Sequence, residues 1–209
     1  ILIERKQYML QLHNLKDQNI IKVITGVRRC GKSTLLMMFA NDIIKKGVDA
    51  NQIQFYNFED LDILSIGDIY QIHTHIKERL IDDKMNYIFL DEVQNIKEFQ
   101  RLVDSLYIKP NVDVYITGSN AYMLSGELAT LLTGRYVEIN ILPLQFSEYY
   151  HFTLSKSPNL SRNEILANYI HFGGIPEYIK QLNNSEKQAD LFAQSILKTI
   201  VEKDIFQRL

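Results

Sequence analysis

The sequence of 209 residues contains one cysteine, four prolines and no tryptophan. A single cysteine excludes an internal disulfide and any metal site built from several cysteines. The fold must therefore be held together by packing.

Long apolar runs and a secretion signal are also missing. The apolar runs are far too short to span a bilayer, and the first residues lack the basic stretch, apolar segment and small-residue cleavage site of a signal peptide. We therefore expect a cytoplasmic protein without membrane contact. The formal net charge is −2, so no sequence-wide attraction to nucleic acid is expected, although a local basic face would still permit it.

Short apolar strand patterns alternate with helical patterns over the first two thirds of the chain. Strand-like runs occupy residues 20–25, 52–57, 86–90, 112–117 and 136–141. Apolar residues at helical spacing occupy residues 32–46, 66–81 and 96–106. Such alternation implies right-handed crossovers and a sheet covered on both faces. We predict a three-layer α/β core with a parallel five-stranded sheet.

The character of the sequence changes after Pro143. Strand signals end there, and three or four helical patterns follow to the C-terminus. Ser161 and Glu164 have the spacing of a capping box, which starts a helix. We predict a core with an N-terminal helical segment over residues 1–143 and a small helical lid over residues 144–209. The chain stops within a helical pattern, so a downstream region is expected.

A glycine-rich loop follows the first predicted strand and opens the first predicted helix. Its residues are Gly26, Val27, Arg28, Arg29, Cys30, Gly31, Lys32 and Ser33, followed by Thr34. They match the phosphate-loop pattern G-x-x-x-x-G-K-S in the strand–loop–helix context that this pattern requires. Loop N–H groups and the helix N-terminus favour phosphate. Lys32 would reach the β- and γ-phosphates and Ser33 would bind Mg²⁺, so ATP or ADP with Mg²⁺ is the predicted ligand. The alternative is a chance match in an ordinary loop.

Two carboxylates, Asp91 and Glu92, follow the buried strand predicted at residues 86–90. Asp91 would hold the Mg²⁺ shell, and Glu92 would orient or deprotonate the attacking water. The alternative is a solvated acidic turn. Ser119 and Asn120 follow the next predicted strand and would lie at the sheet edge where α/β proteins bind ligands, as sensors of the γ-phosphate or the water. A structural turn is the alternative there.

These motifs resemble the AAA+ branch of P-loop ATPases. They are most similar to a family of predicted bacterial and archaeal AAA ATPases with the patterns TG-x-RR-x-GKST, hhhDE-x-Q and TGS, found here at residues 25–34, 88–94 and 117–119. The likeness extends to residues 132–135, 142–148 and 172–177. Members of this family usually continue into a C-terminal domain of unknown function.

The resemblance implies roles for four further residues. Ser119 would fill the sensor-1 position, with Asn120 as the fallback. Arg135 would be an arginine finger for ATP in a neighbouring subunit of a homo-oligomer, or simply an exposed arginine at a helix end. Pro176 would pack on adenine as part of a Gly-x-Pro element, or merely start a helix. No lid arginine is found, and Arg28 and Arg29 would face either the phosphates or solvent.

Three functions compete at this stage. The first is an ATPase that couples its nucleotide state to motion of the lid. The second is a nucleotide-gated switch or scaffold with slow or no turnover that signals through the missing C-terminal part. A small-molecule kinase is the third, but such kinases usually carry several lid arginines, whereas Asp91 and Glu92 suit activation of water. No client protein or nucleic acid is identifiable from the sequence.

Overall fold

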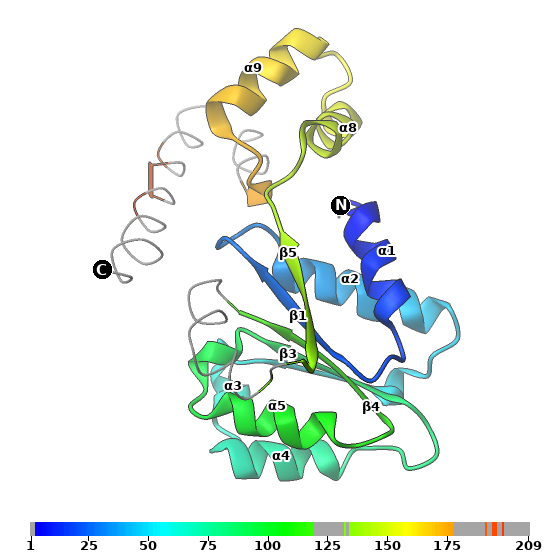
Figure 1. Cartoon of the computed structure of the whole chain (residues 1–209). Helices are drawn as coiled ribbons and strands as arrows, with labels where there is room; N and C mark the ends of the chain where they lie inside the picture. The colour runs from blue at the N-terminus through cyan, green and yellow to red at the C-terminus, as the bar shows by residue number, and fades with distance from the viewer. Residues whose placement is uncertain are drawn as a thin grey trace. The chain divides into compact units, whose positions relative to one another are not determined.

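The computed structural model describes residues 3–118, 132, 134–177, 191, 194, 195 and 198. These residues form two compact units, and Figure 1 traces the chain through both. One unit holds the described residues within Gln7–Gly26 and Lys32–Asn140, and the other holds those within Ile1–Lys6, Val27–Gly31 and Ile141–Leu209. The middle of the predicted phosphate loop thus groups with the C-terminal helices, whereas its two ends group with the sheet.

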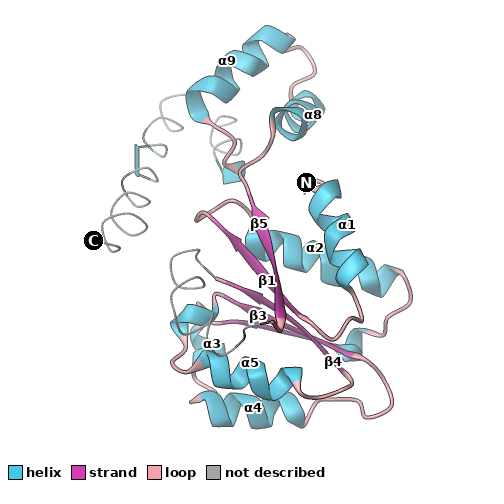
Figure 2. Cartoon of the chain, in the orientation of Figure 1, coloured by secondary structure: helices cyan, strands magenta, loops and turns pink. Residues whose placement is uncertain are grey.

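A parallel five-stranded sheet organises the first unit (Figure 2). Its order is β2-β3-β4-β1-β5. The strands are β1 (Ile21–Gly26), β2 (Ile53–Asn57), β3 (Asn86–Asp91), β4 (Val112–Thr117) and β5 (Tyr136–Ile141). Ile24 pairs with Thr117, and Asn57 pairs with Asp91, so the carboxyl ends of β1 to β4 meet at one edge. The predicted fold class is confirmed.

Helices cover both faces of this sheet (Figures 1 and 2). The longer ones are α1 (Lys6–Leu15), α2 (Lys32–Lys45), α4 (Ile69–Lys77) and α5 (Phe99–Tyr107). The short ones are η1 (Ala50–Gln52), α3 (Leu61–Leu64) and η2 (Val93–Asn95). β3 shows why both faces are covered: Phe89 contacts Phe39 of α2, whereas its neighbours Ile88 and Leu90 belong to the cluster that includes α4 and α5. Every residue of β3 is therefore buried, as in a strand with two covered faces.

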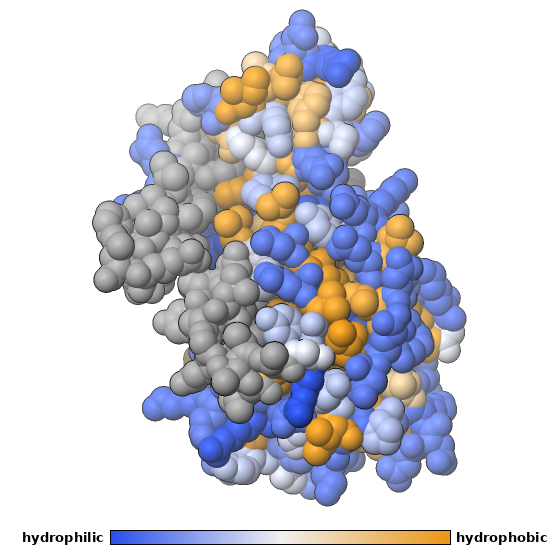
Figure 3. All heavy atoms as spheres, in the orientation of Figure 1, coloured by the Kyte–Doolittle hydropathy of each residue, from blue (hydrophilic) through white to orange (hydrophobic). Residues whose placement is uncertain are grey.

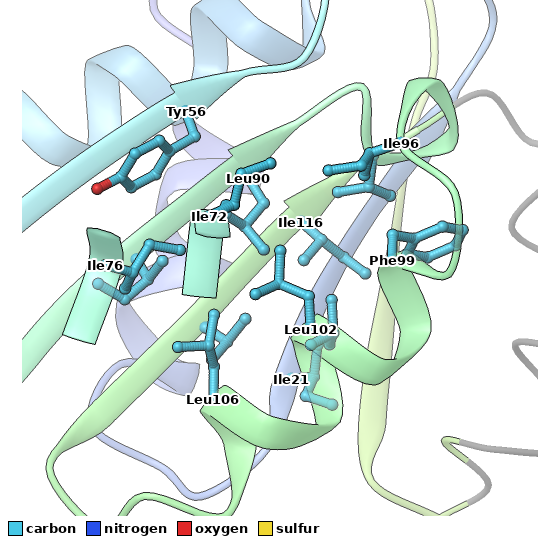
Figure 4. Close-up of a cluster of buried hydrophobic side chains, with 14 of the residues drawn as sticks. Ile21, Tyr56, Ile72, Ile76, Leu90, Ile96, Phe99, Leu102, Leu106 and Ile116 are labelled. Carbon is cyan, nitrogen blue, oxygen red and sulfur yellow. The ribbon is translucent and has the colours of Figure 1, made fainter. Parts of the chain in front are cut away.

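The hydrophobic core between the sheet and helices α4 and α5 is shown in Figure 4. Ile72 and Leu102 of the helices lie in one cluster with Leu90 and Ile116 of the strands, and all four are at most 2% exposed. Burying a side chain of this size contributes about 1.5–3 kcal/mol. This core gives β3 and β4 a rigid base at the edge where both strands end in polar residues.

A buried ionic network lies at the opposite, amino end of the sheet. Lys22 of β1 donates to the carbonyl of Gln18 (2.8 Å) and pairs with Asp113 of β4. Asp113 also accepts hydrogen bonds from the backbone N–H of Asp17 (2.9 Å) and the hydroxyl of Tyr115 (2.8 Å). Burial lowers the pKa of Lys22 and raises that of Asp113, while their mutual attraction opposes both shifts. The network ties the turn after α1 to β1 and β4.

The second unit contains α8 (Phe146–Lys156) and α9 (Arg162–Phe172). Ser161 caps α9, because its hydroxyl accepts from the N–H of Glu164 (3.3 Å) and the Glu164 carboxylate accepts from the N–H of Ser161 (2.8 Å). The predicted capping box is confirmed. The buried centre of this unit consists of Leu144, Tyr149 and Ile165.

Hydrophilic residues cover most of the described surface in the view of Figure 3, with smaller apolar areas between them. Within the described ranges, no helix combines the length and the apolarity that crossing a bilayer would require.

Candidate active site

The predicted phosphate loop connects the carboxyl end of β1 to the first residue of α2. β1 ends at Gly26 and α2 begins at Lys32. Gly31, just before the helix, has a φ of 101°, a conformation that suits glycine because it lacks a Cβ atom. The first turn of α2 has no acidic residue, and its first N–H groups have no helical acceptors. This helix end therefore favours an anion such as phosphate.

The loop residues differ in exposure. Val27 and Arg29 are exposed and Arg28 is half-buried, while Cys30 is fully buried. Arg29 adopts the left-handed conformation with a φ of 64°. The N–H of Cys30 donates to the carbonyl of Val27 (3.3 Å), so the loop turns sharply there. Ser33 and Thr34 follow, half-buried, in the first turn of α2.

Lys32 points its ammonium group at the ends of two strands. Its side chain is only 4% exposed, and it donates to the carbonyl of Gly26 (3.3 Å). The same nitrogen lies 3.6 Å from Oε1 of Glu92. Desolvation offsets much of the attraction in such a shielded pair. A nucleotide phosphate, which carries more charge than a carboxylate, would compete with Glu92 for this ammonium.

Asp91, the last residue of β3, is 1% exposed. Burial raises the pKa of Asp91, and hydrogen bonds from the hydroxyls of Thr117 and Ser33 oppose the rise because they favour the carboxylate. Ser33 and Asp91 thus present two oxygen donors side by side. Mg²⁺ prefers oxygen ligands and usually takes one or two from protein, with phosphate and water completing the shell. This donor set fits Mg²⁺. A second kind of metal site, built from three or more His, Cys, Asp or Glu side chains, does not occur among the described residues.

Glu92 follows β3 in a left-handed backbone conformation (φ 54°, ψ 49°), which is uncommon for a residue other than glycine. Its backbone N–H donates to the hydroxyl of Thr117 (3.0 Å), which holds this turn against β4. Its side chain is 14% exposed and lies between Lys32 and Gln94. Unusual backbone geometry supported by neighbouring contacts is frequent at functional sites.

Two residues of this site were not assigned a role from the sequence. The Thr117 hydroxyl contacts both the Asp91 carboxylate and the backbone of Glu92, and the Gln94 amide contacts the Glu92 carboxylate. The position of Thr117 at a strand end was visible in the sequence, but the pairing of β3 with β4 was not. Gln94 stands in the hhhDE-x-Q pattern, which could have drawn attention to it.

Three of the remaining predicted residues have the following positions. Ser119 and Asn120 lie outside the described residues, so their sensor roles stay predictions. Arg135 precedes β5, forms an ion pair with Asp104 of α5 and lies over the ring of Tyr107 (5.7 Å to the centroid). These contacts within one chain support a structural role, and the arginine-finger role stays a prediction.

Pro176 lies in the second unit, where Pro176 and Glu177 have a helical backbone conformation. Its neighbour Gly174 accepts a hydrogen bond from the N–H of Leu144 (2.7 Å). A Cβ atom at Gly174 would lie 2.2 Å from the carbonyl oxygen of Leu144, so this position requires glycine. Gly174 is thus held against Leu144, just before α8, and contact of Pro176 with adenine stays a prediction.

Arg5 is a further residue that the sequence reasoning missed. Its side chain is 7% exposed and donates to the carbonyls of Cys30 (3.3 Å) and Leu142 (2.8 Å). Its Nε atom lies 3.0 Å from the Glu148 carboxylate in the first turn of α8. One guanidinium therefore joins the predicted phosphate loop to the segment that leads into α8. A lone arginine near the N-terminus carries no sequence signal for such a role.

A family model for AAA domains matches residues 18–150 of the chain. The chain belongs to this family, whose members share the P-loop NTPase fold described above. The sequence is 37% identical to a Haemophilus influenzae protein over 99% of this chain and 51% of that protein. It is 30% identical to protein MJ1544 of Methanocaldococcus jannaschii over 91% of this chain and 43% of that protein. The chain thus spans about half the length of these relatives, both of which are described as uncharacterized.

The Walker-type ATPase PABY2304 of Pyrococcus abyssi has a similar structure, with a TM-score of 0.61 over 99% of this chain and 75% of that one. The two sequences are 17% identical. At this identity the likeness shows a common fold.

Proposed function

We propose that this chain binds Mg·ATP and hydrolyses it to ADP and phosphate. The observation that carries the proposal is the grouping of Lys32, Ser33, Asp91 and Glu92 where β1 and β3 end. Lys32 lies 3.6 Å from Glu92, and Ser33 is hydrogen-bonded to Asp91. A cation, two oxygen donors for Mg²⁺ and a second carboxylate are the groups that P-loop hydrolysis needs. Membership in the AAA family supports the same function.

Each group has a defined task in this proposal. The N–H groups of the loop and of the first turn of α2 bind the phosphates, and Lys32 neutralises charge on the β- and γ-phosphates. Ser33 and Asp91 would hold Mg²⁺, which would polarise the phosphate oxygens. Ser119 or Asn120 would contact the γ-phosphate or the water.

Glu92 is the proposed general base. It accepts a proton from a water molecule whose oxygen forms a bond to the γ-phosphorus. The bond between that phosphorus and the bridging oxygen breaks, and its electron pair leaves with ADP. Hydrogen bonds to Glu92 from its neighbours would keep the carboxylate in one orientation for this step.

A slow nucleotide-gated switch is the second candidate, and one observation favours it. In the described site Glu92 pairs with Lys32, so the proposed base and the phosphate-binding cation engage each other. If the pair between Lys32 and Glu92 persisted with nucleotide bound, the site would turn over rarely.

Homo-oligomerisation also belongs to the proposal, with Arg135 acting on the nucleotide of a neighbouring copy. This role would require the ion pair between Arg135 and Asp104 to open.

Steady-state phosphate release from ATP, measured beside analysis of the nucleotide that remains bound, separates the two candidates. For the ATPase we expect multiple turnovers with Mg²⁺ and none with excess EDTA, because Ser33 and Asp91 act through the metal. Tightly bound nucleotide with less than one turnover per chain would support the switch. Absence of any nucleotide binding would contradict both.

We further propose that nucleotide binding is coupled to the lid helices through Arg5. The support is a set of contacts from Arg5 to Cys30 of the predicted phosphate loop, to Leu142 and to Glu148 of α8, all within one compact unit. Arginine suits this task because its planar fork of donors serves several acceptors at once. A shift of the loop on phosphate binding would therefore reach α8 directly.

Replacing Arg5 with Met should weaken Mg·ATP binding about fivefold or more, the lower end of typical coupling between two sites. It should also remove the ATP-induced protection of α8 amides, because coupling acts equally in both directions. Calorimetry would measure the affinity, and hydrogen exchange over residues 146–156 with and without Mg·ATP would measure the protection.

Lys6→Met is the matched control for this experiment. It removes the same charge from the adjacent residue, but the Lys6 side chain is 81% exposed and has a surface pair with Glu4. We expect it to behave as wild type. If Arg5→Met raised exchange in α8 equally with and without ATP, Arg5 would only support packing and the coupling would be refuted.

A further inference from the structure

Gln94 lies in η2, two residues after the proposed base Glu92. Its side-chain Nε2 donates a hydrogen bond to Oε2 of Glu92. The orientation of the amide follows from chemistry, because an ionised carboxylate only accepts hydrogen bonds and the NH₂ end must face it. Gln94 therefore holds one oxygen of the carboxylate directly.

The other Glu92 oxygen faces a different partner. Oε1 of Glu92 lies 3.6 Å from the ammonium of Lys32. Because nucleotide phosphates compete for that ammonium, the contact with Lys32 weakens when ATP binds. The contact with Gln94 involves no group that binds phosphate. It is therefore the contact that would orient Glu92 in the nucleotide complex.

The carbonyl end of the Gln94 side chain is also informative. Its Oε1 atom is buried, and no group in the described part of the chain donates a hydrogen bond to it. Buried acceptors in native proteins nearly always have a donor, and exceptions call for an explanation. This oxygen belongs to the amide that contacts the proposed base Glu92. The attacking water must bind next to that base before hydrolysis. Such a water has two O–H groups to donate.

We propose that Gln94 is a positioning residue for hydrolysis, a role that rests on the proposed ATPase function. Its Nε2 group fixes the Glu92 carboxylate, and its Oε1 accepts one O–H of the attacking water while Glu92 accepts the other. Only the proton that faces Glu92 leaves the water molecule, and it moves to the Glu92 carboxylate. The second hydrogen stays on the oxygen that joins the γ-phosphorus, and the leaving electron pair departs with ADP.

Gln94→Met tests this role, because Met has a similar length without an amide. We expect the single-turnover rate to fall about tenfold to a hundredfold, a part of the effect of a general base. Mg·ATP affinity should stay within about threefold of wild type, since Gln94 binds no phosphate in this proposal. The control is Asn95→Met on the next, exposed residue of η2, which should keep the wild-type rate.

A double-mutant cycle with Glu92→Gln distinguishes positioning from general support of the fold. Because Gln94 and Glu92 would position the same water molecule, Gln94→Met should reduce the rate by a clearly smaller factor in the Glu92→Gln protein than in the wild-type background. A merely structural role would reduce the rate by the same factor in both backgrounds and overturn the proposal. Gln94→Asn, which keeps an amide on a shorter side chain, serves as the second variant should Gln94→Met fail to fold, and it should also lower the rate through Glu92.

The wild-type protein separates failure of this inference from failure of the proposed function. If wild type binds ATP without hydrolysing it, the ATPase proposal fails and the role of Gln94 falls with it. If wild type hydrolyses ATP and Gln94→Met does so at the same or a higher rate, the function stands and the inference is overturned.

Discussion

Glu92→Gln protein is expected to hold Mg·ATP and hydrolyse it at least about a hundredfold more slowly than wild type, because general-base assistance contributes about 10²–10⁴-fold. Gln fits the same space and still has a carbonyl oxygen to accept the hydrogen bond from Gln94. It lacks the basic oxygen that takes the proton from water. Binding and chemistry should therefore separate, with affinity followed by calorimetry and hydrolysis by single-turnover phosphate release.

Glu98→Gln is a suitable control, since it removes a carboxylate six residues further along the chain. Glu98 is exposed and pairs with Arg101 at 3.1 Å on the surface. Its loss should leave the rate unchanged. Hydrolysis by Glu92→Gln at the wild-type rate would show that Glu92 is not the base, whatever the effect on binding.

The second large effect is expected for Lys32→Ala, which should lose most of its affinity for Mg·ATP. Charge-assisted hydrogen bonds contribute about 1.5–3 kcal/mol, which corresponds to roughly tenfold to more than a hundredfold in affinity. The fold should survive, because Glu92 keeps the hydrogen bond from Gln94 when Lys32 is removed and is therefore not left as an uncompensated charge. Calorimetry with Mg·ATP gives the affinity, and thermal unfolding without nucleotide gives the stability.

Lys45→Ala provides the comparison within the same helix. Lys45 is the last residue of α2 and is exposed, so removing its charge should not affect binding. A folded Lys32→Ala protein with wild-type affinity for ATP would refute the assignment of residues 26–33 as a phosphate loop.

Several elements were predictable from local sequence pattern. The strand predicted at residues 112–117 is β4 (Val112–Thr117), and the one at 136–141 is β5 (Tyr136–Ile141). β4 is buried throughout, and the apolar run of such a strand ends abruptly at polar residues, which makes its bounds visible. The helix predicted over 66–81 was less accurate, since α4 covers only Ile69–Lys77. Asp68 caps α4 through the N–H groups of Tyr70 and Gln71, and periodicity alone did not reveal that start.

Site residues divide in a similar way. The sequence made Lys32, Ser33, Asp91 and Glu92 candidates because each lies at a set distance from a glycine turn or a strand end, and their roles stay predictions. The position of a residue relative to a turn or a strand end does not depend on the order of the strands in the sheet. Thr117 and Arg5 could not be predicted, because their roles depend on which strand neighbours β3 and on where the N-terminal segment packs. Both contacts join residues more than twenty positions apart in the sequence.

The sequence by itself determined the glycine-rich loop between β1 and α2, the alternation of strands and helices, and the carboxylate pair at the end of β3, because these depend on short-range pattern and backbone chemistry. Only the tertiary structure decided which side chains meet across strands. The strand order β2-β3-β4-β1-β5 sets Thr117 beside Asp91 and buries Lys22 with Asp113. From the sequence alone, a charged residue within a strand, such as Lys22, is expected to be exposed. Only the packing shows that Asp113, 91 residues further along the chain, offsets the cost of burying this charge.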